Sequence, residues 1–245
     1  MNKKFDVIGF IPARSGSTRV KNKNIKIIGG RPLLYWSVLK ALKSKMFNKV
    51  IFSSDSSRYF NILKHFLKKD KIDHKILIFD KRSLVHSKTK SKIFDYLKSD
   101  LLKKFNLNEN HLLVQLLPTC PLRKINTIKK IVSFALKKEK NIFSVCKYDF
   151  HVSFALYLKK NLYWKPLFKN SPLINGKTQS QSQIKYFHPN GVANCLFVKH
   201  LQKSNNSIYE KAIPVVVSKK ESLDLDTIED LEIIKILIEK NIIKS

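Results

Sequence analysis

A loop rich in small residues and cations follows the first predicted strand. It spans residues 11–19, with the sequence IPARSGSTR, and leads to Lys23 and Asn24. Small residues let backbone N–H groups approach an anion closely, and arginine offers forked donors to phosphate oxygens. The loop has neither the Gly-Lys-Ser/Thr ending of a Walker loop nor the Rossmann glycine spacing. It predicts a phosphate site, with a flexible connection as the less favoured alternative.

Two aspartates, Asp224 and Asp226, precede the last predicted helix. Carboxylates at i and i+2 in extended backbone point to the same side, so both can reach one cation. Magnesium prefers a few carboxylates together with water and substrate phosphates. Taken alone, an Asp-x-Asp pair more often belongs to a helix cap and a solvated turn, and Asp226 or Thr227 could supply that cap. Asp230 is expected to serve the first helical turn, where negative charge favours the helix dipole.

Three shorter segments add polar side chains. Residues 116–123, LLPTCPLR, carry two prolines that fix a rigid exit from a strand, and Thr119 there could reach a ligand or simply belong to a turn. Residues 187–194, FHPNGVAN, contain an Asn-Gly pair that is typical of tight turns. Asp55 follows the second predicted strand, where it could cap the next helix.

The elements that must position these residues alternate between strand-like and helix-like runs, which favours a parallel sheet with crossover helices. In such a sheet, ligands bind beyond the carboxyl ends of the strands. Between residues 150 and 185 only short β-like pieces occur, at 154–158 and 162–164, so we expect an inserted arm at about 148–186. Strands are predicted at 5–11, 48–53, 75–79, 111–117, 141–146, 193–198 and 213–217, and helices at 32–45, 56–69, 91–105, 126–138 and 227–238.

Composition limits the class of protein. The 245 residues, 43% of them hydrophobic, fit a single α/β domain with a full core. No apolar run approaches the roughly 20 residues of a membrane span, and no signal peptide is evident. Cys120, Cys146 and Cys195 are scattered without metal-ligand spacing. They are expected to be reduced core residues of a cytoplasmic protein without membrane insertion.

The net charge of +30 is the most extreme feature of the composition. A nucleic-acid-binding protein would gather its charge in a stripe, whereas lysine here is spread along the whole chain. A general compositional bias is therefore favoured, and no nucleic-acid partner is expected. The positive field would still steer anionic substrates to a cleft.

The loop from residue 11 to residue 25 resembles the opening signature of the acylneuraminate cytidylyltransferase family, I-P-A-R-x-x-S-K-x-x-P-x-K-N. Arg14, Ser17, Lys23 and Asn24 match that signature, whereas the Ser-Thr-Arg triplet resembles the Kdo-activating branch. Residues 222–231 reproduce the closing motif of the family, S-[IL]-D-[IL]-D-T followed by a helix that begins x-x-D-L. Residues 116–123 and 187–194 resemble its motifs L-Q-P-T-S-P-L-R and Y/F-R-x-N-G-A-I-Y.

The resemblance implies a Rossmann-like nucleotidyltransferase fold: a mostly parallel sheet with helices on both faces and a small arm that forms homodimers. It also implies a Mg²⁺-dependent reaction of CTP with a sialic-acid-like ulosonic acid, giving the CMP-sugar and pyrophosphate. The roles it implies are catalysis by Arg14, Lys23, Asp224 and Asp226; nucleotide binding by Ala13, Arg14, Ser15, Ser17, Lys23, Asn24 and Ser87; sugar binding by Thr119, Gln181, His188 and Asn190; and Mg²⁺ binding by Asp224 and Asp226.

Departures from the family pattern gather on the expected sugar side. Leu117 replaces a glutamine, His188 and Ser180 replace arginines, and Lys88 replaces an aspartate. The alternatives are therefore a Kdo-type or other sugar nucleotidyltransferase, a paralogue that kept its nucleotide pocket but lost activity, and, outside enzymes, a basic nucleic-acid-binding protein.

Overall fold

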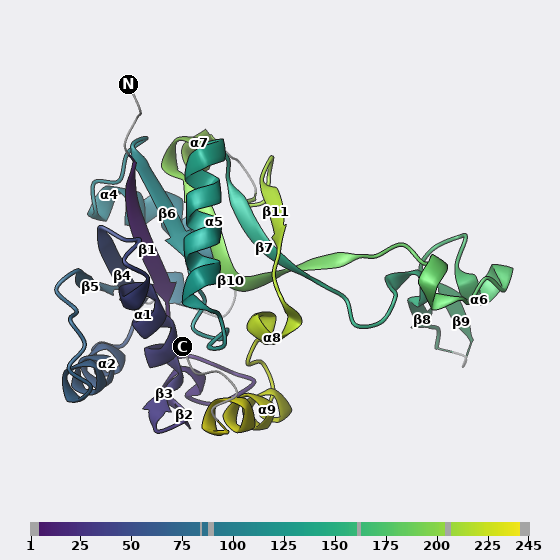
Figure 1. The fold of residues 1–245 in the computed structure, drawn as a ribbon, viewed down its shortest axis with the longest axis horizontal. Helices are drawn as coiled ribbons and strands as arrows, with labels where there is room; N and C mark the ends of the chain where they lie inside the picture. Colours follow the sequence, from purple (N-terminus) through teal and green to yellow (C-terminus); the bar gives the residue numbers. More distant parts are fainter. Residues whose placement is uncertain (1–4, 84, 88–90, 161–162, 204–206, 241–245) are drawn as a thin grey trace.

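A seven-stranded sheet forms the centre of the protein, in the order β11-β7-β10-β6-β1-β4-β5 (Figure 1). The computed structural model describes residues 5–83, 85–87, 91–160, 163–203 and 207–240. β10 is antiparallel to both of its neighbours, and all other pairs in the sheet are parallel. The strands are β1 Asp6–Pro12, β4 Lys49–Ser54, β5 Leu77–Lys81, β6 His111–Gln115, β7 Ile142–Lys147, β10 Phe187–Phe197 and β11 Ile213–Val216.

Both faces of the sheet are buried under helices, as the alternation along β1 shows. Val7 and Ile11 belong to one core cluster, whereas Ile8 and Phe10 belong to another on the opposite face. This is the arrangement expected of a parallel sheet, whose strands are apolar on both sides. The first face is covered by α1 Leu33–Ser44, α2 Ser57–Lys69 and α5 Ile125–Lys138; the second by α3 Ile93–Tyr96, the π-helical turn η3 Leu97–Leu101, α4 Leu102–Lys104 and α7 Val198–Lys203.

A third, smaller core joins the two ends of the chain. Buried Val20 and Ile28 pack with Leu225 and with Ile234 of the last helix, α9 Ile228–Glu239. Thr227 and Asp230 form a capping box at the start of α9, which confirms the expected role of Asp230. The short strands β2 Ile27–Ile28 and β3 Arg31–Pro32 form the hairpin against which α9 lies. The closing motif is thereby held beside the loop that follows β1.

The predicted α/β fold is confirmed, and most predicted elements lie within about three residues of their observed bounds. The predicted helix at 91–105 is instead three successive segments, α3, η3 and α4. β10 begins at Phe187, six residues before the predicted strand, because the Asn-Gly pair lies at a register shift inside a strand rather than at a hairpin turn. The sequence predicted neither the β2–β3 hairpin nor α6 Pro172–Asn175, α7 and α8 Lys219–Ser222.

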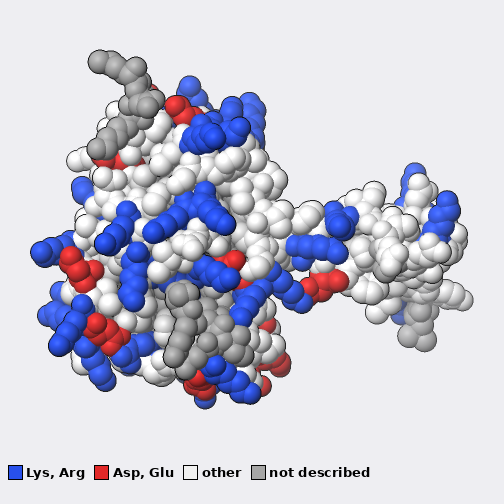
Figure 2. All heavy atoms as spheres, viewed as in Figure 1, with Lys and Arg blue, Asp and Glu red and all other residues white. Residues whose placement is uncertain are grey.

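An arm projects from the sheet between β7 and β10, where the sequence predicted one (Figure 1). It carries the strand pair β8 Leu156–Leu158 and β9 Trp164–Pro166, the helix α6, and the turns η4 Val152–Phe154 and η5 Ser180–Ser182. More than half of the exposed large apolar side chains of the described residues lie on it: Tyr148, Phe150, Leu156, Tyr157, Leu158, Tyr163, Trp164, Leu167, Leu173, Ile174 and Ile184. Figure 2 shows a largely uncharged arm beside a body over which basic side chains are spread.

The three cysteines are core residues, as expected from the sequence. Cys120, Cys146 and Cys195 are all buried and unpaired. Within the described ranges, none of the helices is long and apolar enough to cross a bilayer.

Candidate active site

Two neighbouring cavities open at the carboxyl ends of the parallel strands. The larger, about 480 Å³, is called the main cleft here, and the smaller, about 180 Å³, the loop pocket. The loop pocket contains Ser17, Lys23, Asn24 and Thr119, whereas the main cleft contains Asn190 and Asp224. The two cavities share Pro12, Arg14 and Leu117. Motifs from the beginning, middle and end of the chain therefore meet at one edge of the sheet.

The loop after β1 is held by contacts to β4 and to itself. The backbone N–H and the hydroxyl of Ser15 donate to the two carboxylate oxygens of Asp55, at 2.7 and 2.6 Å. Ala13 donates its N–H to Ser53 at 2.8 Å, and the Asn24 amide donates to the Arg14 carbonyl at 2.9 Å. The N–H groups of Ala13 and Ser15 are thus engaged within the protein. Asp55 stabilises this loop and does not take up the possible capping role, since no side chain caps α2.

Lys23 connects the loop to the closing motif. Its ammonium donates to the Leu225 carbonyl at 2.6 Å and to the Asp226 carboxylate at 3.0 Å, and the Lys23 side chain is only 13% exposed. Arg19 donates to the second carboxylate oxygen of Asp226 at 2.9 Å. Asp226 is therefore bridged by two cations from the very loop that is expected to bind phosphate.

Asp224 lies against the main cleft in a more buried setting. One of its carboxylate oxygens, Oδ1, is buried and has no partner among the described residues. Burial raises the pKa of Asp224, and repulsion by Asp226 adds to this, while a hydrogen bond from Thr119 and the charge of Lys23 lower it. An unpartnered buried carboxylate oxygen is costly, which is typical of a group that receives its partner with a ligand.

The strand exits around the cleft are joined by a buried guanidinium. Arg123 is fully buried, and it donates to the carbonyls of Leu117, Cys120 and Gly191, the last at 3.2 Å. Desolvation lowers the pKa of Arg123 to about 10. The contact ties the exit of β6 to the bulged start of β10. Gly191 is required there, because an added Cβ would lie 2.7 Å from Cδ1 of Leu117.

The predicted sugar-side residues are only partly brought together. Asn190 lines the main cleft, whereas His188 does not. Both ring nitrogens of His188 are engaged: Nε2 lies 3.0 Å from the Cys146 sulfur, and Nδ1 lies 3.0 Å from the Pro189 carbonyl oxygen. Gln181 is exposed on the arm, in η5. Roles for His188 and Gln181 in sugar binding remain predictions.

In the segment after β5, Ser87 is engaged within its own turn, and nucleotide binding by Ser87 stays a prediction. The Ser87 hydroxyl donates to the Ser83 carbonyl at 2.9 Å within its own turn, η2 Val85–Ser87, and Ser87 is not among the residues of either cavity. Lys88 lies outside the described residues. His86, which is in the same turn as Ser87, does line the main cleft.

A sequence model of the cytidylyltransferase family matches residues 8–242. The chain belongs to the cytidylyltransferase family. It is 29% identical over 231 residues to an N-acylneuraminate cytidylyltransferase of Escherichia coli, covering 93% of this chain and 51% of that protein. It is 27% identical to a pseudaminic acid cytidylyltransferase of Campylobacter jejuni, covering 94% of this chain and 95% of that protein. The chain thus spans about half of the first relative and nearly all of the second.

Solved structures agree with this assignment at the level of the fold. A CMP:2-keto-3-deoxy-manno-octonic acid synthetase in complex with CTP superposes with a TM-score of 0.64 at 15% identity, covering 96% of this chain and 99% of that chain. A 4-diphosphocytidyl-2C-methyl-D-erythritol synthase from Anaerococcus prevotii superposes with a TM-score of 0.63, also at 15% identity, covering 97% and 98%. The Rossmann-like nucleotidyltransferase fold implied by the sequence is confirmed.

Several cleft residues were missed from the sequence, among them an arginine and two amides. Arg82 follows β5, is 5% exposed, and lines the main cleft while donating to the Ser53 carbonyl at 2.9 Å. Gln115 and Asn194 line the same cleft from β6 and β10. Arg82 could have been identified from the sequence. It follows a predicted strand, as Arg14 does, and so belongs to the same edge of the sheet. The two amides carried no such signal, since they are polar positions inside strands.

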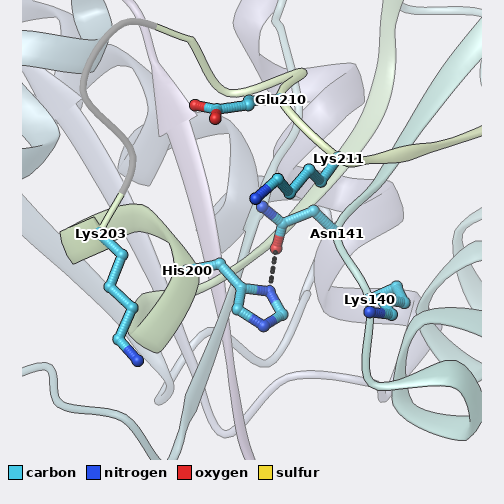
Figure 3. Close-up of a pocket in the computed structure, with 6 residues that line it drawn as sticks. All are labelled: Lys140, Asn141, His200, Lys203, Glu210 and Lys211. Carbon is cyan, nitrogen blue, oxygen red and sulfur yellow. Dashed lines mark hydrogen bonds between the residues drawn. The ribbon is translucent and has the colours of Figure 1, made fainter.

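A separate basic hollow lies at the opposite end of the sheet, beside the start of β7 and β11 (Figure 3). Buried Asn141 fastens this region: its side-chain oxygen accepts from the Phe197 N–H at 2.9 Å and lies 3.2 Å from Nδ1 of His200. Burial and the nearby lysines lower the pKa of His200, which favours its neutral form. The hollow is lined by Lys140, Asn141, His200, Lys203, Glu210 and Lys211. No residue is shared with the main cleft.

Proposed function

We propose that this cytidylyltransferase joins CMP from CTP to a sialic-acid-like nonulosonic acid and releases pyrophosphate. The observation that carries the proposal is the meeting of the basic loop with the two aspartates of the closing motif, joined through Lys23. The acid class is supported by the similarity to the neuraminate and pseudaminate enzymes and to a CMP-N,N'-diacetyllegionaminic acid synthase of Legionella pneumophila, which is 24% identical over 243 residues.

In the proposed reaction, the anomeric hydroxyl of the acid attacks the α-phosphorus of CTP in line. The new O–P bond forms as the bond to the β-phosphate oxygen breaks. Arg14, Lys23 and Arg19 would hold the triphosphate in the loop pocket, because all three side chains line that pocket. Ser17 and Asn24 would position the nucleotide. Catalysis would consist mainly of orientation and charge neutralisation.

The donor set around Asp224 and Asp226 fits a Mg²⁺ ion. Asp224 offers a buried oxygen without a partner, and the described residues hold no group of three or more His, Cys, Asp or Glu that could bind a metal unaided. Two carboxylates completed by nucleotide oxygens and water suit magnesium. When bound, Mg²⁺ would neutralise charge that develops on the transferred phosphoryl group. Binding of the triphosphate by Lys23 and Arg19 would free Asp226 for this role.

The reaction is tested by pyrophosphate release from CTP, with UTP and ATP as comparisons, in the presence of nonulosonic acids and Mg²⁺. We expect CTP-dependent release that Asp224→Ala lowers roughly 100-fold or more while the protein stays folded. The control is Asp6→Ala, an exposed aspartate at the amino end of β1. A fully active Asp224→Ala enzyme would contradict the metal assignment, and a protein that binds CTP but activates no acid would contradict the reaction.

We also propose that the arm forms a homodimer. An isolated arm would leave a large apolar surface in water, which monomeric proteins rarely do. A partner arm reaching across would also bring an exposed residue such as Gln181 toward a second cleft. The oligomeric state in solution tests this.

A further inference from the structure

Arg82 is a buried cation of the main cleft, and contacts outside the cleft fix its position. The residue is only 5% exposed. Its guanidinium donates to the Ser53 hydroxyl at 3.2 Å and to the Ser53 carbonyl at 2.9 Å, and its backbone N–H donates to the Ser54 carbonyl at 2.9 Å. A cation that is already fixed in this way presents its charge to a reactant without reorganisation.

The aromatic ring of Tyr96 supports the guanidinium of Arg82. The guanidinium carbon lies 5.3 Å from the centre of that ring, a distance at which a desolvated cation and a ring attract each other. Tyr96 is 2% exposed and is not among the residues that line the main cleft. It therefore acts on the cleft through the side chains that it contacts.

A buried carboxylate fixes the hydroxyl of Tyr96. Asp80 on β5 is fully buried, and one of its carboxylate oxygens accepts from the hydroxyls of both Tyr96 and Ser53. Its other oxygen accepts from Lys104 at 2.6 Å. Burial and the hydrogen bond to Asp80 raise the pKa of Tyr96, so the hydroxyl remains a donor. Because the Ser53 hydroxyl also accepts from Arg82, the carboxylate, the ring and the guanidinium form one connected network.

The other contacts of Tyr96 reach further along the same side of the cleft. Its ring lies 5.2 Å from that of His86, which lines the cleft and whose Nε2 lies 2.6 Å from a carboxylate oxygen of Asp100. Tyr96 ends α3, and the π-helical turn η3, which carries Asp100, begins at the next residue. Such turns occur frequently at functional sites. The contact of Tyr96 with Asp80 thus joins this side of the cleft to the sheet.

We propose that Tyr96 is a positioning residue of the active site, which is anchored on Asp80 and holds Arg82 in the orientation that the reaction requires. The inference rests on the proposed function and adds to it a residue that does not itself touch the reactants. Without its hydroxyl the ring would lose its anchor, and the guanidinium would lose a fixed support. Small errors in the orientation of a group that acts on the reactants are costly to the rate.

The test is the substitution Tyr96→Phe, which keeps the ring and removes the hydroxyl. We expect kcat/KM for cytidylyl transfer to fall about tenfold or more. Tyr35→Phe is the matched control, because the Tyr35 hydroxyl also donates to a carboxylate, that of Asp70, and the guanidinium carbon of Arg31 lies 5.9 Å from the centre of its ring. Neither Tyr35 nor Arg31 lines the main cleft or the loop pocket.

Thermal unfolding separates positioning from stability in this pair of variants. Both substitutions remove a hydrogen bond to a carboxylate, so both should lower the unfolding temperature, whereas only Tyr96→Phe should lower kcat/KM. An unchanged kcat/KM in Tyr96→Phe, or an equal loss in Tyr35→Phe, overturns the inference and leaves the proposed reaction intact. A wild-type protein that binds CTP but releases no pyrophosphate with any acid overturns the proposed function, and the inference with it.

A double-mutant cycle tests whether Tyr96 acts through Arg82. Arg82→Lys keeps the charge but removes the planar group that lies over the ring. In that background we expect Tyr96→Phe to lower kcat/KM by no more than about twofold, because the side chain that Tyr96 positions is already gone. A further loss of about tenfold in the double variant would show that the two residues act independently, which contradicts the inference.

Discussion

At the scale of single residues, Asp55 and Asp224 illustrate two opposite settings for a carboxylate. Burial raises the pKa of Asp55, but the two hydrogen bonds from Ser15 outweigh it, so the pKa is lowered overall. Asp224 has its pKa raised by burial and has one oxygen without a partner. The first carboxylate stabilises the fold, whereas the second costs stability and is retained where a ligand is expected.

Asp55→Ala is expected to destabilise the loop after β1 and to raise the KM for CTP about tenfold, because Ser15 loses both acceptors. Since the folded pKa of Asp55 is lowered, its contribution to stability is present above the unfolded pKa of about 3.9 and disappears as the pH falls through the folded value. Urea unfolding at pH 7 and pH 3 should therefore show a smaller difference between variant and wild type at pH 3. Exposed Asp73, whose carboxylate accepts from the nearby Lys75 N–H, provides the control variant Asp73→Ala.

Asp224→Asn is expected to leave the unfolding temperature unchanged or to raise it, while abolishing turnover. The reason is the sign of its pKa shift: a raised folded pKa means that the ionised carboxyl is disfavoured by folding at neutral pH. Thermal unfolding followed by circular dichroism, beside the turnover assay, measures both effects. A clear loss of stability would indicate a structural rather than a ligand-binding carboxylate.

At the scale of elements, the site depends on the contacts that hold the segment after β6 against β10. Arg123 at the entry to α5 contacts carbonyls of the β6 exit and of the β10 bulge, and it has one guanidinium nitrogen, Nη1, that is buried without a partner in the described part of the chain. A buried cation with several carbonyl partners is costly to truncate, because the carbonyls are then left unpaired.

Arg123→Met is expected to lower the free energy of unfolding by roughly 3 kcal/mol, since it removes charged hydrogen bonds to three carbonyls. Urea denaturation measures this. Arg58→Met on α2 is the matched control, because Arg58 is exposed and lines neither cavity. An equal effect of both substitutions would show that the contacts of Arg123 contribute nothing beyond those of a surface arginine.

At the scale of the whole molecule, the apolar arm and the dispersed positive charge make separate predictions. Leu158→Glu on β8 is expected to shift the protein from dimer toward monomer in sedimentation, because Leu158 is 78% exposed in the single chain and a buried charge would oppose association. Lys165→Glu on the adjacent β9, also exposed, is the matched control. A monomeric wild-type protein would contradict the dimer outright.

The net charge of +30 is the reason for the non-enzyme alternative, a protein that binds nucleic acid. We expect only weak binding to unrelated DNA duplexes at physiological salt, because the basic residues are spread over the body (Figure 2). Tight binding with a steep dependence on salt concentration would favour a nucleic-acid partner instead.

The alternating elements, the arm and the two terminal motifs could all be predicted from the amino-acid sequence. These depend on local signals: apolar periodicity in the strands, small and basic residues after β1, and the Thr227–Asp230 cap that is four residues long. Such signals can be recognised without knowledge of tertiary contacts, because each arises from the conformation or solvation of a short segment.

How the polar residues of the site are used depends on contacts between segments that are distant in the sequence. Asp55, for which the sequence left a helix-capping role open, accepts from Ser15, 40 positions away, and Lys23 donates to Leu225 across 202 positions. His188 is a predicted sugar ligand whose ring is occupied by Cys146 and Pro189. Each of these side chains can form hydrogen bonds with several kinds of partner. Which partner it takes depends on the order and register of the strands, because these place distant segments within hydrogen-bonding distance.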